Sequence, residues 1–283
     1  MTLPPRIHSR TNARVKELRA AFSGKARACG EPVGLEGEHL ISEAVAAGHA
    51  LLTVAVREGS EPMLQREALC SLVSKRWLLL SRDVFDSVVD THSPQGIAAT
   101  IEIPQPIEVM EHGHGLTLML EDIQDPGNLG TLLRSAKAFG AERVVLGPAS
   151  VNVWSPKVVR SSAGAIFSLP IRHARIAEEA RRFRQRGVSV YAAVTKREGV
   201  VAPFAVDATG PCVWMIGNEG AGLSVEAIEA ATAKVYVPVE VESLNAAVAG
   251  SLLLYESMRQ KSVPGECANA VQHIEAATAG GVL

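Results

Sequence analysis

Residues 237–256 read VPVEVESLNAAVAGSLLLYE. This stretch runs from an apolar strand end, through a loop that carries two acids, to Ser243 and Asn245, where a helix of small residues begins. Two further stretches, NLGTLLRS from Asn128 and IGNEGAGLS from Ile216, also place polar residues and glycines between apolar runs. Binding and catalytic residues often lie on such loops, because a rigid scaffold holds them in place. Together the three stretches indicate a transferase site built from loops at strand ends.

The chain has 283 residues, which favours about two domains, each large enough to bury a core of its own. Apolar residues make up 47% of the chain and charged residues 20%, as in ordinary globular proteins. No apolar run reaches the roughly 18 residues that a membrane span requires. The first ten residues, MTLPPRIHSR, lack the apolar core of a secretion signal, so we expect a cytoplasmic protein.

The pattern of metal-ligating residues predicts no bound metal. The four cysteines lie far apart and form no CxxC pair; they are Cys29, Cys70, Cys212 and Cys267. This spacing argues against a zinc site or a disulfide framework and fits a reducing cytosol. His112 and His114 form an HGH triplet without further ligands nearby, so we interpret them as exposed loop histidines.

The net charge of −2 gives no overall indication of nucleic-acid binding, but positive charge gathers near the N-terminus. Between residues 1 and 30 the only acid is Glu17. The basic residues of this segment are Arg6, Arg10, Arg14, Lys16, Arg19, Lys25 and Arg27. Such a patch neutralises phosphates even in a slightly acidic protein. The alternative is a solvated, partly frayed terminus, and the patch gains weight only if the rest of the chain requires RNA.

Strands and helices alternate in a first block, which predicts a small α/β domain over residues 1–103. We expect helices at 12–21, at 36–47 and after Ser81, a short apolar piece at 33–35, and strands at 51–56, 77–80 and 96–103. Residues 104–115 combine prolines and glycines with little periodicity, so we interpret them as a linker.

A second block alternates in the same way over residues 116–262. We expect strands at 116–120, 143–146, 188–194, 212–216 and 235–237, and helices at 128–139, 174–186 and 244–259, with one more from Ser224. The apolar strands do not obviously alternate, which indicates a mainly parallel sheet covered on both faces. Residues 263–283 are rich in alanine and glycine, and we expect a flexible tail. The predicted fold class is α/β with two domains.

The stretch from Asn128 lies at a turn and a helix start. Residues 125–127 (DPG) form a tight turn, and Asn128 is placed to cap the helix that follows. Arg134 stands in the apolar run LLRSA, which indicates a largely buried helix. A buried arginine requires an acidic or phosphate partner. The alternative is that Asn128 is only a cap and Arg134 only a surface charge.

The other two stretches combine glycines with polar groups. Gly217, Gly220 and Gly222 let the backbone turn sharply and approach a ligand. Their G-x-x-G-x-G spacing is not the dinucleotide fingerprint, so the turn alone is weak evidence of binding. Ser243 is a candidate helix cap. The small residues after Asn245 suit a helix pressed against another backbone or a second subunit.

These motifs carry a family resemblance. NLGTLLRSAKAFGAERVVL, MIGNEGAGLS and VPVEVESLNAAVAGSLLLYE resemble, in order, the three motifs of the SpoU (TrmH-like) RNA 2′-O-ribose methyltransferases, within the SPOUT superfamily. The similarity covers roughly residues 116–260. SRTNARVKELR, LEGEHLISEAVAAG and SPQGIAA resemble the RNA substrate-binding domain that precedes the catalytic domain in many members.

The resemblance implies a SPOUT α/β domain tied in a deep trefoil knot, a topology that unaided pattern reading would not favour. It implies S-adenosylmethionine as the methyl donor, held mainly by backbone groups. The implied cofactor-binding residues are Gly217, Asn218, Gly220, Val237, Pro238 and Leu244. It also implies a homodimer with the final helix at the interface, in agreement with the small residues of that helix.

The implied catalytic residues, expected to converge on one methyl group, are Arg134, Asn128, Glu219, Ser243 and Asn245. A guanidinium stays protonated up to about pH 12, so Arg134 is an awkward base for a ribose 2′-hydroxyl. We instead expect Arg134 to clamp the target phosphate and ribose while the other four residues orient them. The expected RNA-binding residues are Arg6, Arg10, Arg14, Lys16 and Arg160.

Large-subunit ribosomal RNA is the favoured substrate, because family members with this two-domain layout commonly act there. Transfer RNA is the alternative substrate. A non-catalytic RNA-binding protein on the same fold is a second alternative, and a nucleotide-dependent enzyme that uses the glycine-rich turns is a third. The sequence lacks a P-loop and a dinucleotide fingerprint, which weighs against the last.

Overall fold

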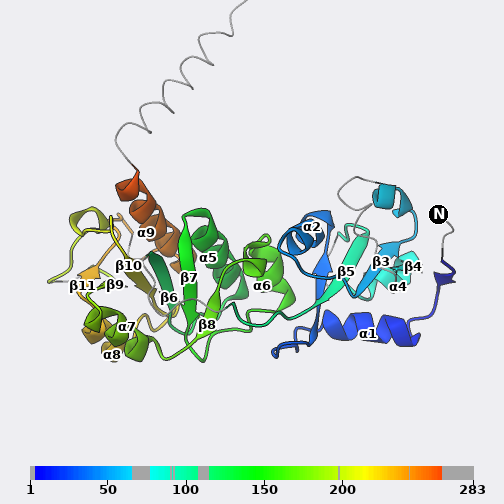
Figure 1. Cartoon of the computed structure of the whole chain (residues 1–283), viewed down its shortest axis with the longest axis horizontal. Helices are drawn as coiled ribbons and strands as arrows, with labels where there is room; N and C mark the ends of the chain where they lie inside the picture. The colour runs from blue at the N-terminus through cyan, green and yellow to red at the C-terminus, as the bar shows by residue number, and fades with distance from the viewer. Residues whose placement is uncertain are drawn as a thin grey trace, which may run out of the picture.

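Two sheets organise the chain (Figure 1). The computed structural model describes residues 4–65, 77–89, 91, 93–107, 115–196, 198–241 and 243–262. Five strands up to residue 102 form the first sheet, and six strands from residue 116 form the second, so the predicted α/β fold class is confirmed. Most of the predicted linker, with His112 and His114, lies outside the described residues, as do Cys70, Cys267 and the predicted tail.

The N-terminal sheet has the order β1-β4-β3-β5-β2. Its strands are β1 (Arg6–Ile7), β2 (Pro32–Glu36), β3 (Thr53–Arg57), β4 (Trp77–Leu80) and β5 (Ile97–Glu102). The helical segments around it are α1 (Ala13–Ala21), α2 (Glu38–Ala46), the 3₁₀ turn η1 (Glu61–Gln65) and α4 (Arg82–Asp86). Strands β1, β4 and β3 are parallel, and β5 runs antiparallel to both β3 and β2.

The C-terminal sheet has the order β11-β9-β10-β6-β7-β8, and every pair in it is parallel. Its strands are β6 (Leu116–Leu120), β7 (Ala141–Leu146), β8 (Ile171–His173), β9 (Ser189–Ala193), β10 (Cys212–Ile216) and β11 (Ala233–Val235). The helices are α5 (Pro126–Ala138), α6 (Pro156–Ser161), α7 (Ile176–Gln185), α8 (Val225–Ala230) and α9 (Ala246–Lys261), with 3₁₀ turns η2 (Ala165–Phe167) and η3 (Pro203–Ala205).

Helices cover both faces of this sheet, which explains why its strands are apolar throughout. Leu118 of β6 and Trp214 of β10 join one apolar cluster with α5 and α9, whereas Met119 and Met215 join a second cluster with α7 and α8. Both sets are fully buried. The two layers of helices are visible above and below the strands in Figure 1. A parallel sheet places all its strand ends on one edge, where the polar loops meet.

Helix α9 lies close against α5, as its small residues predicted. A Cβ atom on Gly250 would lie 2.4 Å from Cδ2 of the fully buried Leu132, so a larger residue there requires the Leu132 side chain to shift. The hydroxyls of Ser135 and Ser251 are 2.7 Å apart across the same contact. The close approach brings the N-terminal end of α9 next to the N-terminal end of α5, so the polar residues at the two helix starts come into contact.

Three details of the sequence interpretation are wrong. Asp125, rather than Asn128, caps α5, and the helix starts at Pro126. Asn245, rather than Ser243, caps α9. The last strand ends at Val235, two residues before the predicted end. A cap must accept hydrogen bonds from amides two or three residues further on, and in both helices only the residue now identified does so.

The two domains touch through side chain to backbone contacts. The amide of Asn152 donates to the carbonyl oxygens of Gly24 and Ala26, at 3.0 and 2.8 Å. Nε2 of His49 lies 3.2 Å from the carbonyl oxygen of Phe167. None of the helices that the structure describes is long and apolar enough to cross a membrane. Cys29 and Cys212 are free thiols, exposed and buried respectively.

Candidate active site

The turn after β6 is built around Asp125. Its Oδ1 accepts a hydrogen bond from the backbone N–H of Asn128 at 2.8 Å. Pro126 occupies the first helical position, where no N–H is needed. The pKa of Asp125 lies below its ordinary value, because this backbone hydrogen bond favours the charged form more than partial burial opposes it; Lys157 adds to the effect. The capped turn fixes Asn128 on the first turn of α5, facing the strand-end loops.

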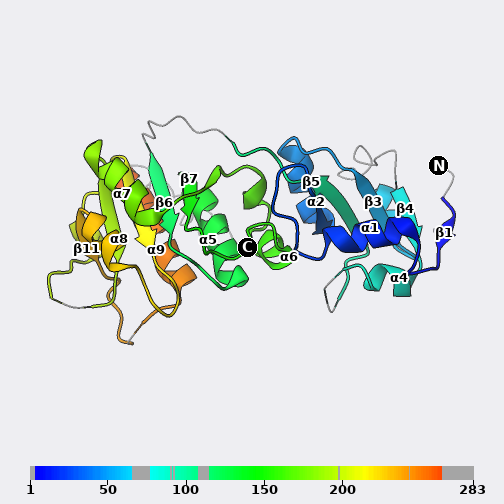
Figure 2. The same cartoon turned by 90° about the horizontal axis from the view of Figure 1, so that it is seen from below.

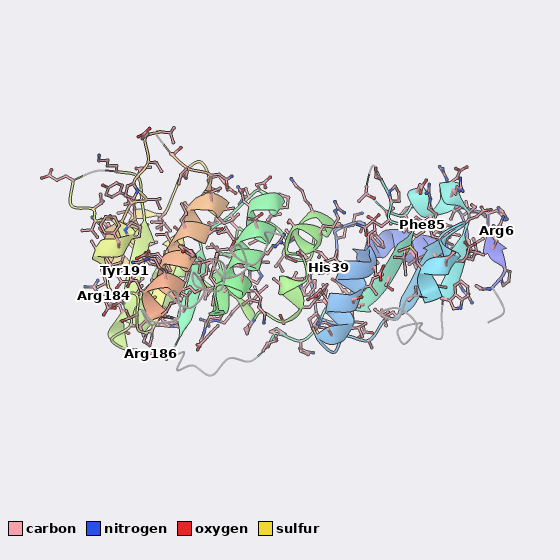
Figure 3. The ribbon with its side chains drawn as sticks, turned by 90° about the horizontal axis from the view of Figure 1, so that it is seen from above. Arg6, His39, Phe85, Arg184, Arg186 and Tyr191 are labelled. Atoms are coloured by element: carbon pink, nitrogen blue, oxygen red, sulfur yellow. The ribbon has the colours of Figure 1, made fainter. Side chains whose placement is uncertain are left out.

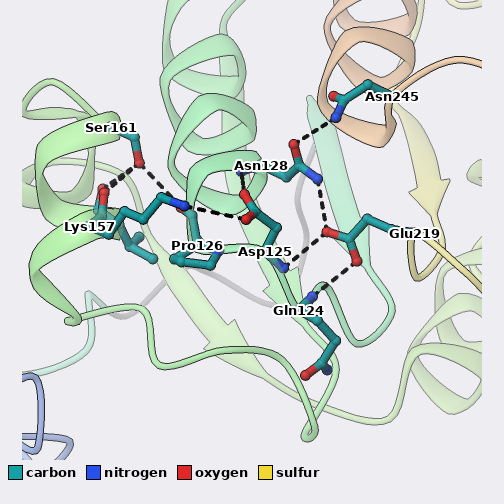
Figure 4. A network of polar contacts seen from close by, with 9 residues as sticks. Gln124, Asp125, Pro126, Asn128, Lys157, Ser161, Glu219 and Asn245 are labelled. Carbon is teal, nitrogen blue, oxygen red and sulfur yellow. Dashed lines mark hydrogen bonds and ion pairs between the residues drawn. The ribbon is translucent and has the colours of Figure 1, made fainter.

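Glu219, in the glycine-rich loop after β10, is hydrogen bonded to the same turn. Its Oε1 accepts from the backbone N–H of Asp125 at 3.1 Å and from Nδ2 of Asn128 at 3.0 Å, and its Oε2 accepts from the N–H of Gln124 at 3.1 Å (Figure 4). Partial burial raises the pKa of Glu219, but the Asn128 amide and these backbone donors outweigh it, so the pKa lies below the ordinary value. The residue is therefore a carboxylate at neutral pH.

Asn245 completes the network from the third stretch. Its Oδ1 accepts the N–H groups of Ala247 and Val248, at 2.9 and 3.3 Å, which caps α9. Its Nδ2 then donates to Oδ1 of Asn128 at 2.9 Å. The Asn128 amide thus donates to Glu219 and accepts from Asn245, and the structure brings together three residues, one from each sequence stretch (Figure 4).

Arg134 does not join this network, contrary to the expected convergence. It is exposed rather than buried, and among the described residues it has no hydrogen bond or ion pair. The error lies in the helix phase: Leu132 and Leu133 are buried, but a helix turns by about 100° per residue, so the next residue faces solvent. Six residues also rotate Arg134 by about 240° from Asn128 and carry it about 9 Å along the axis.

Ser243 also stands apart. It is exposed, and within the described part of the chain its hydroxyl has no partner. Two residues of α6 contact the start of α5: Lys157, which the sequence did not single out, and Ser161, which stands beside the predicted RNA-binding residue Arg160. Lys157 Nζ lies 3.4 Å from Oδ2 of Asp125, and Ser161 Oγ donates to the Pro126 carbonyl at 3.2 Å. The tight fit of Ser161 against Gly130 leaves no room for a Cβ there, but only the three-dimensional structure shows this.

The glycine-rich loop is held closed by its own backbone. Asn218 and Gly222 exchange two backbone hydrogen bonds, at 3.1 and 2.9 Å. The Asn218 side chain accepts from the N–H groups of Gly220 and Ala221 and donates to the carbonyl of Asp122. The Asn218 side chain therefore shapes the loop.

Gly217 is the position where this closure demands glycine. A Cβ atom there would lie 2.1 Å from the backbone carbon of Gly222. At Gly220 a Cβ would meet nothing closer than 3.5 Å. The two glycines, three residues apart, thus differ sharply in the space around them.

The segment after β11 offers main-chain groups to a ligand. Val237, Pro238 and Leu244 lie here, half-buried or exposed. Among the described residues, none forms a hydrogen bond with the backbone of 237–241 or 243–244. The family resemblance implies that main-chain groups of this kind hold S-adenosylmethionine.

The predicted RNA-binding residues differ in whether their side chains are already paired within the protein. Arg6 forms an ion pair with Glu58 at 2.6 Å, and Arg10 donates to the carbonyl of Asp83 at 3.3 Å. Arg14 and Lys16 are exposed on α1, and in the part of the chain that the structure describes their side chains have no partner. The half-buried Arg160 on α6 likewise has no side-chain hydrogen bond or ion pair within the described residues. The described residues include no group of three or more candidate metal ligands.

Comparison with known families gives two matches that together follow the two sheets. A family model described as the SpoU rRNA Methylase family matches residues 115–255. A second, described as the MRM3-like substrate binding domain, matches residues 12–99.

Individual proteins match over nearly their whole length. The Bacillus subtilis protein named 23S rRNA (guanosine(2553)-2'-O)-methyltransferase RlmP is 31% identical, with 88% of this chain and 97% of that protein covered. A crystal structure of an RNA 2'-O ribose methyltransferase has a TM-score of 0.80 at 32% identity, covering 91% and 99% of the two chains. An AdoMet-bound rRNA methyltransferase from Sinorhizobium meliloti has a TM-score of 0.76 at 27% identity, covering 92% and 99%.

Proposed function

Because this chain belongs to the SpoU rRNA methylase family, we propose that it transfers a methyl group from S-adenosylmethionine to a ribose 2′-hydroxyl of large-subunit ribosomal RNA. The observation that carries the proposal is the Asn128 amide, which bridges Glu219 and Asn245 at the shared edge of β6 and β10. The three stretches that resemble the family motifs meet there. The knotted topology that the family resemblance implies is part of the same proposal.

When bound, S-adenosylmethionine supplies an electrophilic methyl group on a sulfonium. The backbone at Gly217, Gly220, Val237, Pro238 and Leu244 holds it, because these positions border the closed loop and the unpaired segment after β11. Asn218 contributes by shaping the loop through its three side-chain hydrogen bonds. A site made of main-chain groups is rigid, and positioning of the reactants alone contributes on the order of 7 kcal/mol or more in favourable cases.

On the RNA side, Arg134 is the clamp for the target phosphate and ribose. Its exposed guanidinium is uncommitted to any described protein group, so it is available to a ligand. A guanidinium does not release its proton near neutral pH, so the 2′-hydroxyl proton passes to the phosphate or to water. Glu219 and Asn245 act as positioning residues through Asn128, and exposed Ser243 borders the ribose. Arg14, Lys16 and Arg160 bind phosphates further along the RNA.

The active form is a homodimer through α9. One side of this helix exposes four large apolar residues at helical spacing: Val248, Leu252, Tyr255 and Met258, each between 37% and 49% exposed. A contiguous apolar stripe of this kind on a helix favours a protein partner. The stripe lies on the same helix that Asn245 caps, so a second subunit would stabilise the site. We place the enzyme in the cytoplasm, where ribosomal RNA is its substrate.

The experiment is methyl transfer from tritiated S-adenosylmethionine to unmodified 23S rRNA, followed by digestion to nucleosides and chromatography. The proposal expects label in a 2′-O-methylated nucleoside. Label in a methylated base contradicts the ribose assignment. The same assay on transfer RNA tests the alternative substrate, and no label on any RNA leaves a non-catalytic RNA-binding protein.

A further inference from the structure

Five arginines gather where β7, β8 and α7 meet, on elements that carry none of the residues assigned to the cofactor or RNA in the proposed function. They are Arg143 on β7, Arg172 on β8, and Arg175, Arg182 and Arg186 on or beside α7, here named the arginine cluster. Figure 3 shows Arg186 and Arg6 at opposite ends of the molecule, so this cluster is distinct from the N-terminal basic patch.

Two arginines of the cluster pair with one buried carboxylate. Glu179 is only 7% exposed and pairs with both Arg172 and Arg182, the latter at 3.3 Å. Glu178 lies 3.8 Å from Arg175, and Glu142 lies near Arg143. Among the residues that the structure describes, these five arginines stand beside three glutamates, which gives the cluster a net positive charge. Arg172, Arg175 and Arg182 are more than half exposed, so this charge reaches solvent.

The cations also crowd one another. Burial lowers the pKa of Arg143, and the neighbouring charges of Arg172 and Arg186 lower it further, against the opposing effect of Glu142 and Glu179. Arg143 in turn lies over the ring of Phe183, 5.9 Å from its centre, which keeps it beside α7. Like charges held this close repel, and an anion placed among them relieves the repulsion.

The position of the cluster relates it to the active site. β8 is two strands from β6, roughly 10 Å across the sheet, and α7 covers the face opposite the one covered by α5 and α9. β8 is also the sheet edge nearest the N-terminal domain in Figure 1, and Figure 2 shows the two domains side by side along the long axis. In Figure 1, α7 and α1 lie below the sheets of their own domains, so one elongated ligand along this side would meet both.

We propose that the arginine cluster is a second RNA-binding surface, which holds phosphates of a structured region flanking the methylated nucleotide. Arginine suits this role better than lysine, because its planar fork makes paired hydrogen bonds to phosphate oxygens. The inference rests on the proposed function, since it takes the ligand to be the RNA substrate. It adds a contact surface that none of the family-derived site residues supplies.

The test compares binding of in vitro transcribed 23S rRNA at several salt concentrations. Arg175→Gln with Arg182→Gln removes two charges and leaves Arg172 to pair with buried Glu179. Affinity falls as salt rises, and each lost phosphate contact makes the plot of log affinity against log salt less steep by about 0.7–0.9. The slope of the double variant should therefore be smaller in magnitude by about 1.4–1.8. Arg175→Lys with Arg182→Lys keeps the charges and should restore most of the slope.

Lys234→Gln is the matched control, because Lys234 is an exposed cation on β11, at the opposite edge of the sheet. It should leave the slope unchanged. If the double glutamine variant binds with wild-type affinity and slope, the arginine cluster does not contact RNA. Methyl transfer by the wild-type protein, measured on the same RNA, separates the two claims: failure there ends the proposed function, whereas normal transfer with unchanged variant binding ends this inference alone.

Discussion

Nδ2 of Asn245 donates a hydrogen bond to Oδ1 of Asn128, 2.9 Å away and 117 residues earlier in the chain. The same Asn128 amide donates to Glu219 from its nitrogen. Because an amide has distinct donor and acceptor ends, this pairing sets its orientation without ambiguity. One side chain therefore ties together the starts of α5 and α9 and the loop after β10.

Asn128→Asp tests the bridge that the Asn128 side chain forms between Glu219 and Asn245. The substitution keeps the shape but removes the Nδ2 donor and sets a second carboxylate against Glu219. A lost hydrogen bond to a charged group costs about 1.5–3 kcal/mol, so kcat should fall about 10- to 150-fold. Binding of S-adenosylhomocysteine should change little. Asn12→Asp, which changes a helix cap in the other domain, is the control. Wild-type turnover by the Asn128 variant would remove the bridge from the mechanism.

Arg134→Lys tests the clamp. Lysine retains the charge but loses the planar fork that binds a phosphate through two hydrogen bonds. The loss of one charge-assisted hydrogen bond should lower kcat/KM for RNA roughly 10-fold, with cofactor affinity unchanged. Steady-state kinetics with varied RNA gives this directly. A lysine variant that methylates at the wild-type rate contradicts the clamp.

Gly217→Ala and Gly220→Ala form a matched pair in one loop. At Gly217 the added methyl would lie 2.1 Å from the carbon of Gly222, whereas at Gly220 its nearest contact is 3.5 Å away. Bound ligand at 100 times its Kd stabilises a protein by about 2.7 kcal/mol. Thermal shift should therefore show stabilisation by S-adenosylhomocysteine in the wild type and Gly220→Ala, and little in Gly217→Ala. Equal shifts in both variants would show that the cofactor does not use this loop.

The pKa of Glu219 predicts a pH dependence. Because the folded pKa lies below the ordinary 4.5, the folded state binds fewer protons than the unfolded state. The stabilisation is therefore present above the ordinary value and is lost as pH falls through the folded pKa. Glu219→Gln should melt below the wild type at pH 7, and this difference in melting temperature should narrow as the pH falls below about 4.5. A gap that does not vary with pH would mean that the Glu219 charge adds nothing to stability.

Leu252→Glu tests the apolar stripe of α9. Leu252 is 44% exposed in the single chain and becomes buried in the proposed dimer. A carboxylate at a desolvated interface is unfavourable, so sedimentation should show a shift from dimer to monomer. Phe204→Glu is a control, because Phe204 is 70% exposed but lies outside this stripe. A wild-type protein that sediments as a monomer rules out the dimer altogether.

Much of the architecture follows from apolar pattern alone. Continuous apolar strands such as that ending at Ile216 require cover on both faces, and this predicted the parallel sheet. The order of polar residues around Asn128, Glu219 and Asn245 also indicated where strand ends carry a site. Local periodicity does not reveal which of two nearby polar residues caps a helix, because aspartate, asparagine and serine all suit that position. Hence Asp125 and Asn245 replaced the predicted caps.

The exposure of Arg134 could not be predicted from the sequence pattern. Its neighbours in sequence are buried, and only the helix phase relative to α9 decides that it faces solvent. Short elements such as β8 and α6 were also missed, since three to six residues carry too weak a pattern to read. The contacts of α6 with the α5 start depend on packing of segments distant in sequence, which no local pattern encodes.

Ribose methylation by this protein can be measured by mapping 2′-O-methyl groups in total RNA from the source organism, with and without this gene. We expect one large-subunit rRNA nucleotide to lose its 2′-O-methyl group in the deletion strain. The wild-type gene should restore it and the Asn128→Asp variant should not. An unchanged set of ribose methyl groups, or a lost methyl group on a base, would contradict the proposed function.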